Sequence, residues 1–227
     1  MCLYVNIMNI LVSGKLIIQN SVDTYYTVRY IGIPNGIVRM ENKDLITENA
    51  IKLFSQKGYD SVGVQELCEV SGITKPTLYF YFKSKAGVLE HIVNTKGEEL
   101  LSKIQTALTY RHDFIKGLTD VLKAEINFAV ENPAFFDLHC TLLNSPENSE
   151  QKNIYSNTIL QIQKCFDDFF FSSCKEFGNM RGKEMLYSKL FHNNVVSAAV
   201  LVAKGHLKYS EEIVYQIIHS QVYGMAN

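Results

Sequence analysis

The segment between Glu69 and Glu90 carries the clearest chemical pattern in the sequence, because lysines alternate there with hydroxyl-bearing and aromatic residues and no acid is present. Lysine ammonium groups attract phosphates by charge, and hydroxyl groups bind them through hydrogen bonds. The pattern therefore predicts a local surface for a nucleic-acid backbone. Its members are Lys75, Thr77, Tyr79, Phe80, Tyr81, Lys83 and Lys85.

The composition of the whole chain shows no general preference for polyanions. The 227 residues include 22 Lys and Arg against 23 Asp and Glu, and the formal net charge is -1. A content of 47% hydrophobic and 20% charged residues is typical of a globular protein and excludes a wholly disordered chain. A nucleic-acid surface must therefore be local on this molecule rather than general.

Helical periodicity surrounds this segment with short elements that would position it. Ile46, Ala50 and Phe54 share one face of a first helix, which we expect to end at Gly58. Gly72 suits the tight turn of a helix-turn-helix, and the alternative is an ordinary helical hairpin. The lysine cluster favours the helix-turn-helix. Further helices are expected from about residue 64, from 76 to about 82, and from about 85 onward.

The stretch from Ile46 to Leu89 resembles the DNA-binding domain of the TetR/AcrR family of bacterial transcriptional regulators. The resemblance covers roughly residues 43–91. Its most specific part is the run Thr-Leu-Tyr-x-x-Phe-x-x-Lys, which follows Gly-Ile-Thr and begins at Thr77. The other matching positions are Ala50, Leu53-Phe54, Gly58-Tyr59, Val64, Leu67 and Gly72-Ile73.

The resemblance implies a DNA contact for each exposed position of the third helix and its flanks. Base edges and nearby phosphates would face the start of that helix, while Leu78 and Phe82 would pack beneath it. Lys85 would hold a phosphate from the start of the fourth helix. The implied DNA-binding residues are Lys75, Pro76, Thr77, Tyr79, Phe80, Tyr81, Lys83 and Lys85.

Two places depart from the family pattern. Val62 and Gly63 stand where members often have Thr or Ser, so the cap of the second helix has no hydroxyl to offer. Ala86 and Gly87 replace the usual acids after Lys85, so the fourth helix is expected to lack a capping-box partner. Both departures bear on capping rather than on the identity of the fold.

Residues 1–39 differ in character from everything that follows. They are rich in β-branched residues and tyrosine, and they form neither an amphipathic helix nor an apolar run long enough for a membrane span. At Met40 the sequence becomes charged and helix-forming. We expect Met40 to be the native start and residues 1–39 to reflect an upstream start, with an added β-hairpin or flexible arm as the alternative.

The remaining chain is helical by pattern, and it contains neither a βαβ unit nor a glycine-rich phosphate loop. The expected fold class is therefore all-α, with about nine helices. Its domains are a doubtful extension at 1–39, a helix-turn-helix DNA-binding domain at 40–88 and a larger helical domain at 89–227. Pro133 and Pro146 mark breaks in the larger domain. Its later helices are expected at about 133–144, 147–177, 183–204 and 210–223.

By resemblance, the larger domain would bind a small-molecule effector and form a homodimer. Its last two helices, 183–204 and 210–223, would pair with the same two helices of a second subunit. The nearly all-apolar stretch from Val195 to Val202 agrees with a helix covered on most sides. The alternative is that both helices fill the core of a monomer.

Aromatic residues around the middle helices are the candidates for an effector pocket. Such residues more often form a plain core, but they can also line a cavity for an apolar or amphipathic molecule. Tyr155 and Cys140 could add polar contacts. The candidate pocket residues are Asn127, Phe128, Phe135, Phe136, His139, Phe166, Phe169 and Phe170.

The function expected is that of a cytoplasmic DNA-binding regulator, a repressor by family analogy, which binds a palindromic operator as a homodimer and is released by its effector. An architectural DNA-binding protein of the same fold, without an effector, is the alternative. The chain has no GxSxG, HExxH or glycine-rich signature, so we expect no enzyme and no cofactor. Five scattered cysteines predict reduced thiols, and His139 beside Cys140 predicts no metal site.

Overall fold

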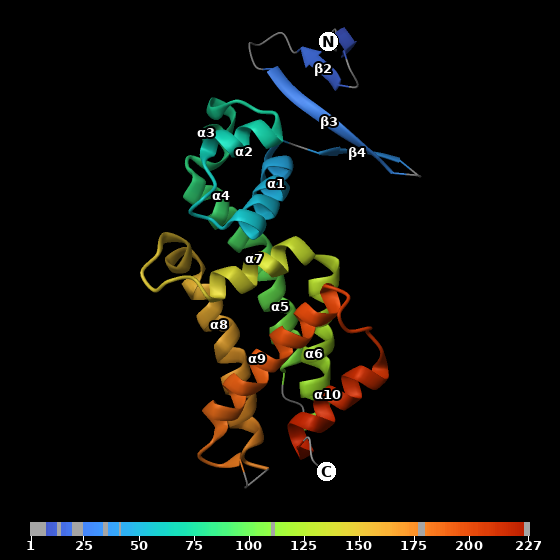
Figure 1. The fold of residues 1–227 in the computed structure, drawn as a ribbon, viewed down its shortest axis with the longest axis vertical. Helices are drawn as coiled ribbons and strands as arrows, with labels where there is room; N and C mark the ends of the chain where they lie inside the picture. Colours follow the sequence, from blue (N-terminus) through green and yellow to red (C-terminus); the bar gives the residue numbers. More distant parts are fainter. Residues whose placement is uncertain are drawn as a thin grey trace, which may run out of the picture. The chain divides into compact units, whose positions relative to one another are not determined.

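The computed structural model describes residues 8–12, 15–19, 25–33, 36–40, 42–109, 112–176 and 180–224. Its contacts divide the chain into two compact units, Met1–Val88 and Leu89–Asn227. Figure 1 follows the chain from strands at the N-terminal end, through a group of short helices, to a larger group of longer helices. The two units are described separately below.

Strands occupy the segment that precedes the first helix. β1 (Met8–Val12), β2 (Lys15–Gln19), β3 (Tyr25–Ile33) and β4 (Gly36–Met40) form an antiparallel sheet in the order β1-β2-β3-β4. Ile10 pairs with Ile17, Ile17 with Thr27, and Ile31 with Val38, so β-branched residues occupy the ladder. These strands lie outside the expected all-α class, which holds for every regular element described from residue 42 to residue 223. An added β-hairpin or flexible arm is the alternative interpretation of residues 1–39, and the native start at Met40 stays a prediction.

The helices of the first unit are α1 (Asn42–Lys57), α2 (Val64–Ser71) and α3 (Lys75–Phe82), followed by the first half of α4 (Lys85–Ile92). The apolar face expected of α1 is buried, and Phe54 also packs its ring against that of Tyr59 at 5.1 Å between centroids. Gly58 ends the helix with a φ of 80°, a left-handed conformation that favours glycine. Leu67 of α2 and Leu78 of α3 complete this small core.

A π-helical turn, η1 (Val93–Gly97), joins α4 to α5 (Glu98–Ala107) without a break in the helix. The hydroxyl of Thr95 donates to the carbonyls of His91 at 2.8 Å and Ile92 at 3.2 Å, so a side chain takes part in this irregular turn. Gly97 lies against the ring of Tyr155, because a Cβ at this position would meet Tyr155 Cε2 at 3.4 Å.

The second unit is built around α6 (Phe114–Glu131), which packs against α5, α9 and α10 and turns into α7 (Figure 1). Asp113, Ser149 and Ser210 cap α6, α8 and α10, each accepting a backbone N–H three residues on. With 85–107 counted as one helix, the described residues hold nine helices, which agrees with the expected number. The remaining helices are α7 (Pro133–Leu143), α8 (Glu150–Ser173), α9 (Glu184–Ala203) and α10 (Glu211–Tyr223).

One helix is shorter than expected. The pattern predicted a helix over 147–177, but Asn148 adopts a φ of 68° and Ser149 then caps α8, so the helix begins at Glu150. It ends at Ser173. No helix among the described residues is long and apolar enough to cross a membrane.

Candidate nucleic-acid interface

The turn between α2 and α3 is fixed by its backbone. Gly72 has φ 62° and ψ 40°, a left-handed conformation that a side chain would disfavour, and its N–H donates to the carbonyl of Glu69. The next N–H, that of Ile73, donates to the carbonyl of Cys68 at 3.0 Å. The chain thus reverses tightly at the position that the sequence predicted, and α3 follows α2 at a defined angle.

Side chains from α1 hold α2 in place. The amide of Asn49 donates to the hydroxyl of Ser71 at 3.2 Å, at the last residue of α2. At the other end, Lys57 in the last turn of α1 pairs with Glu66 in the first turn of α2. These contacts support α2 from both ends, and α2 in turn supports α3.

The outer face of α3 is open, as the DNA-binding prediction requires. Leu78 and Phe82 are buried beneath the helix, in agreement with the packing role expected for them. Phe80, by contrast, is 78% exposed, although a phenylalanine with no other role is normally buried. None of the eight residues expected to contact DNA is buried: Lys75, Pro76, Thr77, Tyr79, Phe80, Tyr81, Lys83 and Lys85.

The start of α3 has no side-chain cap. Thr74 occupies the N-cap position, but its hydroxyl lies 2.9 Å from the hydroxyl of Thr77 and makes no capping hydrogen bond to the backbone. Pro76 stands in the first turn, where its missing N–H leaves no internal hydrogen bond unmade. The two threonine hydroxyls therefore meet on the exposed N-terminal end of the helix, beside Lys75.

The end of α3 is strained at an exposed lysine. Lys83 takes φ 62°, and its N–H donates to the carbonyl of Tyr79 at 3.0 Å, which stops the helix. This conformation normally favours glycine, and a lysine in it carries a backbone cost of about 1 kcal/mol. The position thus combines backbone strain with an exposed positive charge.

Lys85 is held more closely than the sequence suggested. Its Nζ donates to the carbonyl oxygen of Tyr59 at 3.0 Å and lies 4.1 Å from the centroid of the Tyr59 ring. Ammonium groups are attracted to aromatic faces, so Tyr59 fixes the lysine by two interactions. Tyr59 is therefore a residue of this interface that sequence reasoning did not assign, because 26 positions separate the two partners.

Gly87 has a steric role. A Cβ at this position would lie 1.9 Å from the carbonyl oxygen of Phe82, so no other residue fits without a shift of the backbone. The hydroxyl of Ser84 accepts the N–H of Gly87 at 2.9 Å and caps α4, although Ala86 and Gly87 supply no acid for a capping box. Gly87 thus allows α4 to begin directly over the end of α3. Together these features define a helix-turn-helix DNA-binding domain.

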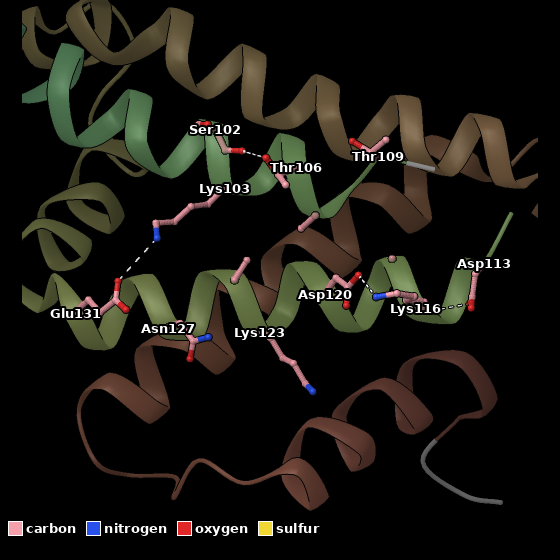
Figure 2. A pocket seen from close by; sticks show the side chains of 13 residues that line it. Ser102, Lys103, Thr106, Thr109, Asp113, Lys116, Asp120, Lys123, Asn127 and Glu131 are labelled. Atoms are coloured by element: carbon pink, nitrogen blue, oxygen red, sulfur yellow. Dashed lines mark hydrogen bonds and ion pairs between the residues drawn. The ribbon is translucent and has the colours of Figure 1, made fainter. Parts of the chain in front are cut away.

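The candidate effector residues divide into two sets in the second unit. Asn127 is exposed, and it lines a groove of about 610 Å³ on the outside of α5 and α6 (Figure 2). That groove is polar, with Lys116 2.5 Å from Asp120 and Lys103 3.9 Å from Glu131. The other candidates are buried in the interior: Phe128, Phe135, Phe136, His139, Phe166, Phe169 and Phe170.

The buried candidates form separate ring contacts. Phe169 stacks on Phe114 at 5.6 Å between centroids, and Phe128 meets Phe135 edge to face at 5.9 Å. Such contacts are those of an ordinary aromatic core. His139 differs from them, because its Nδ1 lies 2.6 Å from the hydroxyl of buried Tyr155.

Two further buried polar residues were missed in the sequence. Glu125 of α6 is buried, and burial raises its pKa to about 8. His192 of α9 stacks on Phe166 at 4.3 Å between centroids, and burial lowers its pKa to about 4. In the sequence, each is a single polar residue on the apolar face of its helix. They are far apart in the chain, so the sequence gave no indication that they lie in the same region.

The first unit matches a known family of DNA-binding proteins. Residues 46–92 match the sequence profile of the bacterial regulatory proteins of the tetR family. The probable HTH-type transcriptional regulator YttP of Bacillus subtilis is 33% identical over 70 residues, which are 31% of this chain and 34% of YttP. YuxN of the same organism is 41% identical over 64 residues, and the match spans 22% of its length. The chain thus spans about a third and a fifth of these two relatives.

A longer match is found with IcaR of Staphylococcus aureus, described as the negative transcriptional regulator of the biofilm operon icaADBC. The two are 28% identical over 140 residues, which are 59% of this chain and 74% of IcaR. Over residues 46–92 the chain is therefore similar to the bacterial regulatory proteins of the tetR family. These relatives are regulators and not enzymes, in agreement with the absence of catalytic signatures.

Solved structures show the same fold over most of the chain. A putative fatty acid metabolism regulator of Clostridium perfringens has a TM-score of 0.69 at 20% identity, over 81% of this chain and 99% of that one. FadR of Bacillus subtilis, solved in complex with stearoyl-CoA, has a TM-score of 0.64 at 14% identity, over 80% and 98%. At these identities the likeness establishes the fold.

Proposed function

We propose that the protein is a transcriptional repressor that binds a palindromic operator as a homodimer and leaves it when a small apolar or amphipathic effector binds. The observation that carries the proposal is the open outer face of α3, where Phe80 and Tyr79 are exposed between Lys75 and Lys83. The curated description of IcaR as a negative regulator supports repression rather than activation.

The homodimer is supported by apolar residues that the chain leaves uncovered on its last two helices. Leu186, Leu190 and Leu201 of α9 are exposed, as is Tyr215 of α10. Exposed apolar side chains grouped on one helix face are typical of an interface. A two-fold dimer would also present two copies of α3 to the two halves of a palindrome.

Release requires an effector that binds better to one arrangement of the protein than to another. The continuous helix over 85–107 gives a covalent route for such a change, because α4 and α5 are joined through η1. An effector held in the second unit would act on the first through this helix.

The proposal is tested by selecting DNA from a random pool with the full-length protein. We expect a few sharp palindromic sites with half-sites about one helical turn apart, roughly 34 Å. Many weakly specific sites would instead support an architectural DNA-binding protein. The selected site then serves for variants: Phe80→Ala should weaken specific binding about tenfold, with little change in non-specific binding, because the ring carries no charge.

Val70→Ala is the matched control, since Val70 is another exposed apolar residue of the first unit but lies at the end of α2. It should bind the selected site like the parent protein. Equal affinities of the Phe80→Ala variant and the parent would contradict the assignment of α3 as the reading helix.

A further inference from the structure

Four helices of the second unit contribute to a group of buried polar side chains. Glu125 comes from α6, His139 from α7, Tyr155 from α8 and His192 from α9, and all four are buried. His139 contacts Tyr155 directly, and it lies near enough to His192 for that ring to lower its pKa. Glu125 likewise raises the pKa of Tyr155. Because α6, α7 and α9 pack against one another and α7 also packs against α8, these four residues lie in one region of the interior, called here the interior polar cluster.

Several atoms of this cluster have no hydrogen-bond partner within the described protein. They are both carboxyl oxygens of Glu125, Nε2 of His139 and Nε2 of His192. A buried polar atom without a partner costs about 1–3 kcal/mol, and folded proteins contain few such atoms. The four unpartnered atoms of this cluster indicate that another molecule forms hydrogen bonds with them.

The hydrogen bonds that the cluster does make determine which free atoms donate and which accept. Burial raises the pKa of Tyr155, so its hydroxyl keeps its proton, and Nδ1 of His139 at 2.6 Å is the one acceptor that the described residues offer it. The hydroxyl therefore donates to Nδ1, because the reverse arrangement would leave its own buried proton without an acceptor. Since a neutral imidazole carries one N–H, the proton of His139 lies on Nε2, which is a free donor.

His192 has the opposite tautomer. The amide nitrogen of Gln163 donates to Asp167 at 2.8 Å and to Ser188 at 3.2 Å, which fixes the amide oxygen toward His192. Nδ1 of His192 therefore donates to that oxygen at 3.3 Å, and its Nε2 is a free acceptor. The free atoms thus include a donor on one imidazole and an acceptor on the other.

The cluster carries no net charge near neutral pH. Burial raises the pKa of Glu125 to about 8, so its carboxyl group is mainly protonated and can both donate and accept. Burial lowers the pKa of His139 to about 3 and that of His192 to about 4, so both rings are neutral. No lysine or arginine is among the buried residues of the described chain. An anionic group placed here would find no countercharge.

A metal ion does not fit the cluster. Among the described residues, no three His, Cys, Asp or Glu side chains are grouped so that they could hold one. The rings beside the cluster are instead apolar, with Phe136 5.4 Å from His139 and Phe166 4.3 Å from His192 between centroids. These surroundings suit a hydrocarbon that carries a single polar group.

We propose that the effector is an apolar molecule with one uncharged group that both donates and accepts a hydrogen bond, a hydroxyl or a primary amide, and that His139 binds this group together with His192 or Glu125. The inference rests on the proposed function, because it assigns a ligand class to the effector site of the second unit. The polar group accepts from Nε2 of His139 and donates to Nε2 of His192 or to the carboxyl oxygen of Glu125.

The test compares four ligands of one chain length on the full-length protein by isothermal titration calorimetry. The ligands are 1-octanol, octanamide, octanoate and octylammonium. We expect the two uncharged ligands to bind at least about tenfold more tightly than both ions, because the site offers matched hydrogen bonds and no countercharge. Tighter binding of either ion, or no binding of any of the four, would overturn the proposal; the last result would assign the free atoms to buried water.

Two variants connect this selectivity to the cluster. Glu125→Leu should weaken 1-octanol binding about tenfold and yet raise the melting temperature, because it removes a buried group without a partner. His192→Phe keeps a ring beside Phe166 but removes the acceptor, and it should weaken 1-octanol binding by a similar factor. Unchanged binding by both variants, with melting temperatures showing that they fold, would exclude the cluster as the site.

DNA binding is measured on the same samples, so that the two proposals can fail separately. A protein that selects a sharp palindrome but shows no preference among the four ligands would retain the proposed DNA-binding function and lose this inference. A protein that binds 1-octanol selectively but selects no DNA site would contradict the proposed function alone.

Discussion

The outer face of α3 and the interior of the second unit depart from the usual distribution of residues in opposite directions. On α3, the apolar ring of Phe80 is exposed to solvent, whereas in the second unit the carboxyl group of Glu125 is only 1% exposed. Each placement costs stability in the isolated protein, and each would be relieved by a partner: DNA bases for Phe80 and a polar ligand group for Glu125. Each candidate site therefore contains a residue in an unfavourable environment: an apolar ring in water, or a buried carboxyl group without a hydrogen-bond partner.

The two regions differ in how their residues are brought together. The candidate DNA-binding surface, residues 75–85, lies on α3 and the residues that directly follow it, so its chemistry is set by local spacing. The interior polar cluster takes one residue from each of four helices, so it depends on tertiary packing. Variants can therefore test whether a substitution in each region affects only its own helix or also the helices packed against it.

The largest effect is expected from the pH dependence of Glu125. Its pKa is raised by burial to about 8 from 4.5, so the folded state keeps a proton that the unfolded state releases. Folding stability is therefore fully present below pH 4.5 and declines as the pH rises to about 8, by roughly 4 kcal/mol. His139 and His192 act in the opposite direction, but only below pH 6.5, because burial lowers their pKa values.

Glu125→Leu should remove this decline. The difference in free energy of unfolding between the variant and the parent should grow from pH 5 to pH 8.5, as measured by urea denaturation at each pH. Cys140 and Tyr155, which feel the charge of Glu125, titrate above this range. Parallel curves for the two proteins would show that Glu125 is not held protonated.

The next effect concerns the packing of the first unit. Gly87→Ala should destabilise the protein by about 3 kcal/mol, because the new Cβ would overlap the carbonyl oxygen of Phe82. Gly63→Ala is the matched control: nothing lies within 4 Å of its Cβ, and we expect a loss below about 1 kcal/mol. Urea denaturation of both variants distinguishes the positions, and equal losses would contradict the steric role of Gly87.

Two lysines of the candidate DNA-binding surface should differ in their effect on stability, because only one of them contacts another residue of the described chain. Lys75→Ala and Lys85→Ala should each lower the dependence of DNA affinity on salt by about one unit of log–log slope, if each contacts one phosphate. Only Lys85→Ala should also reduce stability, by about 0.5–1 kcal/mol, because Nζ of Lys85 is bound to Tyr59. Titrations at several salt concentrations test the first effect, and an unchanged slope for Lys85→Ala would confine that residue to holding Tyr59.

The smallest effect is expected at the end of α3. Lys83→Gly should raise the free energy of unfolding by about 0.5 kcal/mol, because glycine relieves the left-handed backbone but gains freedom in the unfolded state. The same change should weaken DNA binding, since a charge is lost. A variant that is less stable than the parent would show that the lysine side chain, rather than its backbone, supports the turn.

Local features of the structure were predictable from the sequence, while contacts between distant residues were not. The buried face of α1, the turn at Gly72 and the open face of α3 follow from periodicity and turn chemistry over fewer than ten residues. The contact between Lys85 and Tyr59 and the clearance at Gly87 depend on how helices meet, for which the sequence holds no local sign.

The candidate effector residues show the same limit in the second unit. Phe128 is buried, but its neighbour Asn127, which was grouped with it, lies on the outside, because adjacent residues on a helix point about 100° apart. Glu125 and His192 were missed, since a single polar residue on an apolar helix face does not reveal its tertiary partners. The effector pocket itself therefore stays a prediction.

The number of residues in the π turn at Val93–Gly97 determines how α4 is rotated relative to α5. A π turn accommodates one more residue than an α-helical turn, and each residue of an α-helix corresponds to a rotation of about 100°. Deleting a single residue here would allow an uninterrupted α-helix, and every side chain of α4 would then be turned by about that angle relative to those of α5. The length of this five-residue segment thus determines the rotation of α4 relative to α5. Two homologues with identical DNA-binding and effector residues would differ in this rotation if one of them lacked the extra residue.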